Sequence, residues 1–399
     1  FYITLPPINL QYFSFYIYVF FVILVFKATS LINIKTDVKR IFKEGYNKKN
    51  FYKNNFIFIL IIGVFASIFL VNMIFSPLFM SKKYSSRIVI DESKDFSTDI
   101  KEVDFNMIPL LDKESSTKLG DRVMGQMSEL VSQFEVSSIY TQINYNNEII
   151  RVTPLEYATP IKWLTNRKNG VKGYIKVNSV TGKSELVKLD KGMKYMPSAF
   201  FNENLYRKLR FMYPTKIFGN ISFEIDNEGN PFWTIPTIKY SAVGLLKEVN
   251  GLIIFDPITA KSTYYKINEI PKWVDQVFNA NLVIEQVDDW GMYKNGFFNS
   301  IFGQKGVVQT TDGYNYMIQD DDVYMYTGIT SINSDESNIG FIITNLRTKQ
   351  TSFYNVPGAE EYSAMDSAKG QVQQMNYEST FPLLINLNNR PTYLISLKD

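Results

Sequence analysis

A pattern of two apolar arms around a polar turn occurs three times along the chain. Residues 173–189 read GYIKVNSVTGKSELVKL, residues 251–267 read GLIIFDPITAKSTYYKI, and residues 340–356 read GFIITNLRTKQTSFYNV. Each copy begins with Gly, turns at Asn or Asp, has a Thr three residues later and continues into a second apolar arm. This pattern predicts a β-hairpin that is used repeatedly.

A second hairpin and a helix accompany each copy. Polar turns between short apolar runs predict the upstream hairpins at 143–152, 223–236 and 314–326, and apolar periodicity predicts helices at 197–211, 271–287 and 359–375. A connector over 77–135, with a strand at 86–90 and a helix at 112–134, leads into repeat units at 136–215, 216–296 and 297–378, and residues 379–399 begin a truncated fourth unit. A sheet covered by one helix buries one face, so tandem units predict an elongated α+β rod of antiparallel sheets.

Two uncharged stretches lie near the N-terminus. Residues 1–26 carry no charged side chain, and residues 56–75 read FIFILIIGVFASIFLVNMIF. Because a helix crosses a bilayer with about 20 apolar residues, these stretches predict two transmembrane helices in a membrane domain over 1–76. For the first stretch, which Pro6 and Pro7 shorten, a buried or interfacial helix is the alternative.

The loop between these stretches, residues 27–55, contains eight Lys and Arg side chains against Asp37 and Glu44. Short basic loops stay on the cytoplasmic side, which predicts a cell-membrane protein with a large extracytoplasmic C-terminal region. Within the loop, residues 36–45 fit either a short interfacial helix or a solvated connector. The rest of the chain holds 34 basic and 37 acidic residues. A nearly neutral surface of this kind argues against nucleic acid as a partner.

Composition narrows the chemistry further. The chain of 399 residues contains neither Cys nor His, which removes disulfides, thiolate nucleophiles, zinc clusters and the usual base of a catalytic triad. An extracytoplasmic protein without disulfides fits a Gram-positive envelope best. The Ser-x-x-Lys match at 115–118 is explained by helix capping, and the Gly-Lys-Ser at 182–184 by a β-turn. We expect neither catalysis nor a cofactor.

One resemblance to a known family accompanies the repeat. The run FEIDNEGNPFWTIP, followed by GLIIFDPITAKSTYYKI and IPKWVDQVF, resembles the PepSY and YpeB-like small domains of bacterial envelope proteins, in which a strand pair ends in an Asp-Pro-x-Thr-Gly type of turn. The matching residues are Asp256, Pro257 and Thr259, with Ala260 at the usual Gly position, and the third unit departs further. The resemblance covers the middle units. It implies a membrane-tethered binding module that restrains or partners envelope proteases and cell-wall enzymes.

Acidic residues supply the candidate chemical sites. Asp320, Asp321 and Asp322 form the densest cluster, and oxygen ligands of this kind suit Ca²⁺, although a solvated hairpin turn is the simpler interpretation. The turn with Asp226 and Glu228 has the same two interpretations. A carboxylate pair drawn from Asp335, Glu336 and residues 360–361 would suit hydrolysis of a sugar bond, although Glu360 and Glu361 are more simply placed in the first turn of a helix.

Aromatic residues supply the candidate interaction surface. Trp290, Phe297 and Phe298, with Ile301 and Phe302, lie between the second and third units and predict a wedge between them. The four Trp residues, 163, 233, 273 and 290, occur at matching places within the units, which favours a packing role over stacking on glycan rings.

Together these patterns predict a non-catalytic, membrane-anchored repeat protein that binds or scaffolds components of a bacterial envelope. Its expected partners are the lipid bilayer, other envelope proteins and further copies of itself. Two alternatives stay open: an accessory or sensor subunit of a membrane complex, and a carboxylate-dependent cell-wall hydrolase. Because the chain starts with Phe1 and ends in PTYLISLKD, we expect the natural protein to extend beyond both ends.

Overall fold

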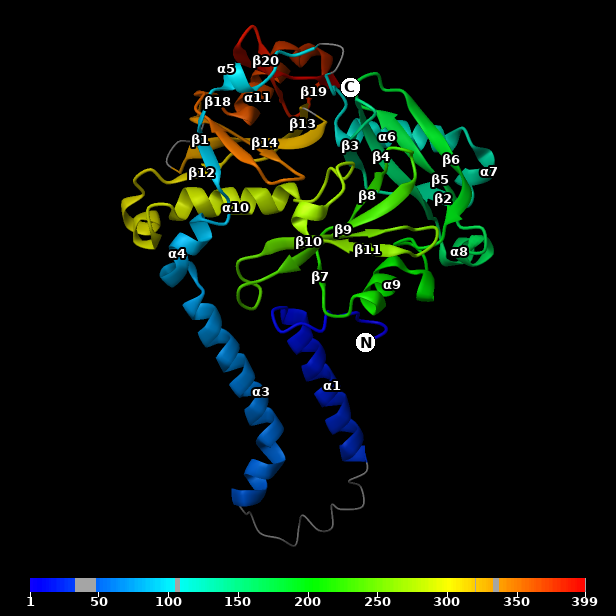
Figure 1. Ribbon diagram of the computed structural model, residues 1–399, viewed down its shortest axis with the longest axis vertical. Coiled ribbons are helices and arrows are strands. Elements are labelled where there is room, and N and C mark those ends of the chain that lie inside the picture. The colour runs from blue at the N-terminus through cyan, green and yellow to red at the C-terminus, as the bar shows by residue number, and fades with distance from the viewer. Residues whose placement is uncertain (33–47, 105–107, 320, 333–336, 399) are drawn as a thin grey trace.

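The computed structural model describes residues 1–32, 48–104, 108–319, 321–332 and 337–398. Three β-sheets form the body of the molecule, and two long helices, α1 (Phe13–Ile32) and α3 (Lys48–Ile74), extend from the same end of it (Figure 1). Most of the predicted basic loop, residues 33–47, and with it the segment 36–45, lies outside the described residues.

The three sheets follow one another along the chain. Sheet 1 contains β2 (Phe134–Val136), β3 (Thr141–Tyr145), β4 (Glu148–Tyr157), β5 (Val171–Asn178) and β6 (Ser184–Met193). Sheet 2 contains β7 (Ile217–Phe218), β8 (Ser222–Ile225), β9 (Pro231–Lys239), β10 (Glu248–Phe255) and β11 (Ser262–Tyr265). Sheet 3 contains β12 (Val308–Thr310), β13 (Asn315–Gln319), β14 (Asp322–Ser331), β16 (Gly340–Asn345) and β17 (Thr351–Tyr354), and β1 (Ile90–Lys94) joins it parallel to β17.

The sheets share one strand order. In each, a long strand (β4, β9 or β14) pairs on one edge with two short strands and on the other edge with the first strand of the recurring hairpin. The six predicted hairpins are confirmed: β3–β4 and β5–β6, β8–β9 and β10–β11, β13–β14 and β16–β17. The recurring sequence pattern therefore occupies the same position in each sheet.

The turn of the recurring hairpin is also the same in each sheet. Its first residue, Asn178, Asp256 or Asn345, accepts hydrogen bonds at 2.8–3.1 Å from the backbone N–H groups two and three positions later. The Thr three positions after this residue accepts, through its hydroxyl oxygen, a backbone N–H at 3.3 Å in all three turns. An Asx side chain stabilises a turn in this way, which explains why the pattern requires Asn or Asp there and Thr three residues later.

Several helices begin or end at residues other than those predicted. Residues 112–134 form α6 (Lys113–Gly125), which Asp112 caps, then α7 (Ser128–Val131) and the start of β2. Residues 197–211 form a 3₁₀ turn (Phe201–Glu203) and α9 (Leu205–Met212), and the third predicted helix is α11 (Glu361–Gln371) with a 3₁₀ turn (Gln373–Met375). In place of the helix predicted at 271–287, the structure has α10 (Ala280–Tyr293), which both begins and ends later in the chain.

The late start of α10 has a structural cause. Residues 275–278 bond to all three sheets. Asp275 accepts the backbone N–H of Asn144 in sheet 1 and donates its own to Glu224 in sheet 2, at 2.8 Å each, and the N–H groups of Val277 and Phe278 both donate to Leu346 after β16. These backbone groups are therefore unable to form a helix.

Short elements complete the described chain. The helices are α4 (Pro77–Ser85), α5 (Phe96–Asp99), α8 (Pro160–Asn166), a 3₁₀ turn (Ile267–Glu269) and a π-helical turn (Asn299–Gly303). Three small two-stranded sheets pair β15 (Ser337–Asn338) with β18 (Gly358–Ala359), β19 (Glu378–Ser379) with β22 (Leu397–Lys398), and β20 (Leu383–Leu387) with β21 (Arg390–Leu394). The predicted start of a fourth unit is the β20–β21 hairpin.

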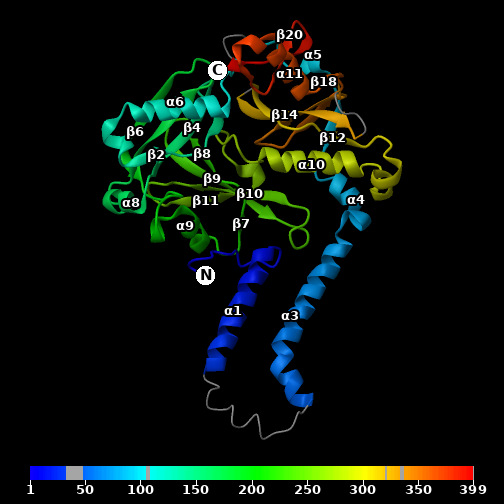
Figure 2. The same cartoon turned by 180° about the vertical axis from the view of Figure 1, so that it is seen from behind.

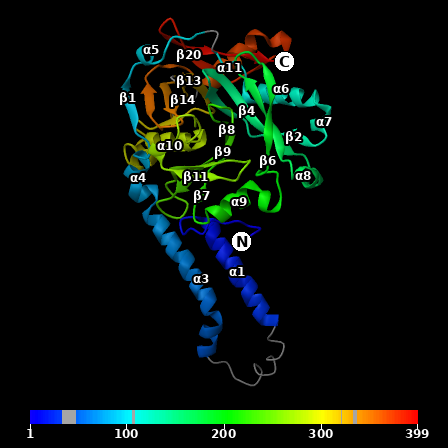
Figure 3. The same cartoon turned by 45° about the vertical axis from the view of Figure 1, so that its right-hand side comes forward.

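The prediction of an elongated rod is wrong. One apolar cluster joins sheets 1 and 2 and contains Tyr174, Phe223 and Trp233. A second joins sheets 2 and 3 and includes Leu252 and Met325, with α10 between them. Because β3 of sheet 1 also lies against β14 of sheet 3, the three sheets meet around a common centre, as Figures 2 and 3 show from two further sides.

The prediction of two transmembrane helices is also wrong. The apolar part of α1, Phe13–Ala28, is shorter than a span, and no single helix within the described ranges is both long and apolar enough to cross a membrane. Only a pair, Ile59–Ile74 with Pro77–Ser85, passes that test jointly, and it is bent by 56°. The bend lies where Pro77, which lacks a backbone N–H, starts a new helix after Ser76.

Candidate functional site

The three junctions between the sheets differ in how they are filled. Apolar clusters close the junctions between sheets 1 and 2 and between sheets 2 and 3. The junction between sheets 1 and 3 shares no such cluster among the described residues, since the third cluster joins sheet 3 to residues 96–103, to Ile108 and to the β20–β21 hairpin. Cavities occupy this junction instead, and strand β13 borders two of them. We call it the open junction.

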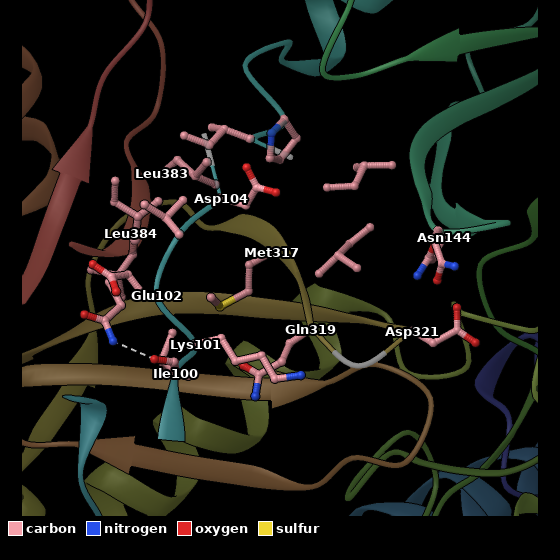
Figure 4. Close-up of a pocket in the computed structure, with 18 residues that line it drawn as sticks. Ile100, Lys101, Glu102, Asp104, Asn144, Met317, Gln319, Asp321, Leu383 and Leu384 are labelled. Atoms are coloured by element: carbon pink, nitrogen blue, oxygen red, sulfur yellow. Dashed lines mark hydrogen bonds between the residues drawn. The ribbon is translucent and has the colours of Figure 1, made fainter. Parts of the chain in front are cut away.

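The first cavity lies between β13, the β3–β4 turn, β20 and residues 100–104 and 108–109, and its volume is about 370 Å³. Figure 4 shows Met317 and Gln319 in its middle, Asn144 and Asp321 at one end, and Leu383 and Leu384 on the opposite side. A hydrogen bond of 2.6 Å from Asn386 to the carbonyl oxygen of Ile100 fixes the connector against β20. The volume is in the range of small-molecule and peptide side-chain pockets.

The lining of the first cavity combines apolar walls with an acidic edge. Its apolar side chains come from four separate segments: Ile100, Val103, Ile108, Ile149, Met317, Ile318, Leu383, Leu384 and Ile385. Glu102, Asp104 and Asp321 line it together with Lys101 as the one basic side chain among the described lining residues. This combination suits a ligand with an apolar body and a positive charge.

A buried acidic pair lies at the centre where the sheets meet. Glu224 is fully buried, and it accepts the Thr234 hydroxyl at 2.6 Å and the Asp275 backbone N–H at 2.8 Å. Burial raises the pKa of Glu224 to about 7, although these hydrogen bonds oppose the rise. Burial, and then the neighbouring Glu224, raise the pKa of Asp275 well above its ordinary value. Burial therefore favours the neutral, protonated forms of both side chains. Their hydrogen bonds with the backbone N–H groups of Asp275 and Asn144 connect sheet 2, residue 275 and sheet 1.

Sequence patterns gave no signal for this pair. Alternation along β8 places Glu224 on the opposite face from Phe223 and Ile225, which predicts a solvated carboxylate. Residues 275–276 cover that second face in the structure. Asp226, which the sequence singled out instead, accepts the backbone N–H groups of Glu228 and Asn230 and shapes the β8–β9 turn.

The predicted acidic cluster does not converge on one point. Asp322 is buried, and both of its oxygens accept hydrogen bonds from the Arg347 guanidinium at 2.6–2.7 Å, while Asn345 adds a third at 2.7 Å. Asp321 is exposed and lines the first cavity. Asp320 lies outside the described residues. Within the described ranges, no group of three or more acidic residues is placed to hold a metal ion.

The residues considered for hydrolysis are also separated. Glu361 is fully buried, its pKa is raised by burial, and it receives a 3.3 Å hydrogen bond from Asn338. Glu360 caps α11 by accepting the backbone N–H of Ser363. Asp335 and Glu336 lie outside the described residues. In the Ser-x-x-Lys match, the backbone N–H of Ser115 donates to the Asp112 carboxylate at 2.7 Å, and the Lys118 side chain is exposed beside Glu114.

The aromatic candidates lie at one end of α10. Trp290 packs on the second apolar cluster and carries Lys294 4.0 Å above its ring. Phe297 stacks on Tyr293, whereas Phe298 is 65% exposed and stacks on Phe302, which is 81% exposed. The structure thus places the half-buried Trp290 against the core and the Phe298–Phe302 pair on the surface. Trp163 and Trp233 are buried in the first cluster.

Comparison with known proteins adds no family: no family model matches the chain, and no curated protein matches it either. The site must therefore be interpreted from its own geometry.

Proposed function

We propose that the protein is a non-catalytic binding or scaffold module and that its open junction receives a segment of a partner protein. The observation that supports this most directly is the contrast between the junctions. Two are filled by the protein's own apolar side chains, and the equivalent third one contains a cavity with apolar walls. A protein surface hollowed in this way exposes apolar area that a partner is able to cover.

The chemistry of the lining defines the partner segment. An apolar side chain of the partner segment contacts Met317, Leu383 and Leu384. A Lys or Arg next to it in the partner faces Glu102, Asp104 and Asp321. Strand β13 pairs only with β14 among the described strands, so an extended segment is able to lie along it. The resemblance of the middle units to PepSY and YpeB-like modules suggests the same class of function and stays a prediction.

A cavity-filling variant tests this proposal. Met317→Trp places an indole in the cavity, and Met375→Trp makes the same change at an exposed position in the 3₁₀ turn after α11. A displayed library of random peptides is selected against the purified wild-type chain. We expect enrichment of peptides with an apolar residue next to Lys or Arg, at least tenfold weaker binding to Met317→Trp, and unchanged binding to Met375→Trp.

Two results would contradict the proposal. One is that the wild-type chain enriches no peptide. The other is that the enriched peptides bind Met317→Trp as tightly as the wild type, which would place their site elsewhere.

A further inference from the structure

Three arginines are buried among the described residues, and the guanidinium groups of two of them have polar partners. Arg87 forms ion pairs with Asp289 and Glu285 of α10 and with Glu248 of β10. Arg210 donates hydrogen bonds of 2.6–3.3 Å to three backbone carbonyl oxygens. These two contacts are the usual ways in which a folded protein accommodates a buried guanidinium.

Arg151 has neither kind of partner. It is 6% exposed, its Nε has no hydrogen-bond acceptor, and no ion pair joins it to any carboxylate of the described chain. Asp112 lines the same cavity, but its Oδ1 caps α6 at 2.7 Å and its Oδ2 accepts a hydrogen bond from Lys398 at 2.8 Å. Burial lowers the pKa of Arg151, yet a guanidinium remains protonated in proteins. Among the described residues no carboxylate therefore forms an ion pair with Arg151, and Asp112, whose charge attracts it without a bond, is already paired with Lys398.

Arg151 lines the second cavity of the open junction, which has a volume of about 480 Å³. Its cross-strand partner in the β3–β4 register is Gln142, so the two side chains lie next to each other on the same face of sheet 1. Gln142 is 3% exposed, and its Nε2 donates to no acceptor. A guanidinium and an amide N–H without partners thus lie side by side at one cavity wall.

The other walls supply a surface for the body of a ligand. Tyr314, Tyr316 and Phe381 bring aromatic rings from sheet 3 and from the segment before β20, and Ile221 adds an aliphatic side chain from sheet 2. Asn279, the N-cap of the 14-residue helix α10, also lines the cavity. The positive end of a helix dipole favours an anion. The cavity therefore combines aromatic side chains with polar ones, and Arg151 and the N-terminus of α10 add positive charge to its lining.

We propose that Arg151 and Gln142 bind the carboxylate of a small organic acid whose apolar body lies against the aromatic walls of this cavity. A carboxylate carries one charge and accepts the two parallel N–H bonds of a guanidinium. A phosphate dianion would bring a second charge, and Lys113, the other basic residue of the described lining, is exposed to solvent. This inference goes beyond the proposed function because it concerns a different cavity and a different ligand, and a peptide bound along the first cavity neither requires nor excludes it.

The test uses the full chain and a panel of simple acids. Acetate, benzoate and 3-phenylpropionate are titrated by calorimetry into the wild type, with benzamide as the neutral counterpart of benzoate and inorganic phosphate as a second anion. We expect benzoate or 3-phenylpropionate to bind at least tenfold more tightly than benzamide and phosphate. Arg151→Met should lose at least tenfold in this affinity, and its melting temperature without ligand should be equal to or above that of the wild type.

A matched variant and a second cavity variant complete the test. Arg167→Met removes an arginine of sheet 1's periphery that pairs with Glu203, and it should bind the acid like the wild type. Gln142→Met should weaken binding about fivefold to tenfold, which keeps the proposal testable even where Arg151→Met fails to fold. The proposal is overturned if no acid of the panel binds, if benzamide or phosphate binds as well as the acids, or if the foldable cavity variants bind like Arg167→Met.

Discussion

The substitution Glu224→Gln should remove much of the pH dependence of folding. The folded protein holds the proton of Glu224 up to a pKa of about 7, whereas the ordinary value is 4.5. A glutamine has the same shape, its Oε1 is able to accept the Asp275 N–H, and its Nε2 is able to donate to the Thr234 hydroxyl. The variant thus keeps the hydrogen bonds and loses the titrating proton.

The direction of the effect follows from the raised pKa. The unfolded chain releases the proton of Glu224 near pH 4.5, and the folded chain keeps it until about pH 7. Stability from this group is therefore fully present below pH 4.5 and is lost as the pH rises through 7. Between pH 5 and pH 8 the wild type should lose about 2–3 kcal/mol through Glu224 alone.

Urea denaturation at pH 5 and pH 8 measures this loss. The difference between the two unfolding free energies should be about 2–3 kcal/mol smaller in Glu224→Gln than in the wild type. Glu228→Gln, an exposed change in the turn that follows the same strand, should leave the difference unchanged. A Glu224→Gln variant with the full pH dependence of the wild type would refute the assignment of a neutral, buried Glu224.

Three further predictions concern the recurring hairpin and the buried ion pairs of Arg87, and urea denaturation checks all of them. Ala260 and Lys349 have φ values of 62° and 66°, so replacement of either by Gly should stabilise the protein by about 0.5–1 kcal/mol; a loss of stability would contradict this. Gly340→Ala should destabilise the protein by about 2–3 kcal/mol, because the added Cβ would lie 2.2 Å from the carbonyl oxygen of Tyr354. An unchanged unfolding free energy would show that β16 and β17 are able to move apart without cost. Arg87→Met should destabilise by about 3–5 kcal/mol, since it leaves Asp289 and Glu285 of α10 without their cation; a loss of less than 1 kcal/mol would indicate that these acids are solvated.

The repeat was predictable because its chemistry is local. Asn178, Asp256 and Asn345 each bond to backbone groups within three residues, so the signal lies in a short stretch of sequence. The same holds for Asp112 at the start of α6. Hairpins and caps depend on neighbours in the chain, and a single sequence contains that information.

The arrangement of the units was not predictable in the same way. The position of α10 depends on bonds from residues 275–278 to strands more than fifty residues away, which override the local apolar periodicity. Arg151 resembles any other charged residue in a hairpin, and its burial arises only because β13 and residues 112 and 381 close around it. The second apolar run, residues 56–75, lies in α3 up to Ile74, and it passes the test for a span only together with Pro77–Ser85, from which it is bent by 56° at the break before Pro77.

The central claim is that the junction between sheets 1 and 3 is the binding surface. Hydrogen–deuterium exchange of the full chain, with and without the peptide enriched in the selection, tests it most directly. The account predicts slower exchange at β13 (315–319), at the β3–β4 turn (144–149) and at residues 100–104, and no change at the exposed aromatic turn 297–303. Protection confined to 297–303, or spread over the two closed junctions alone, would contradict it.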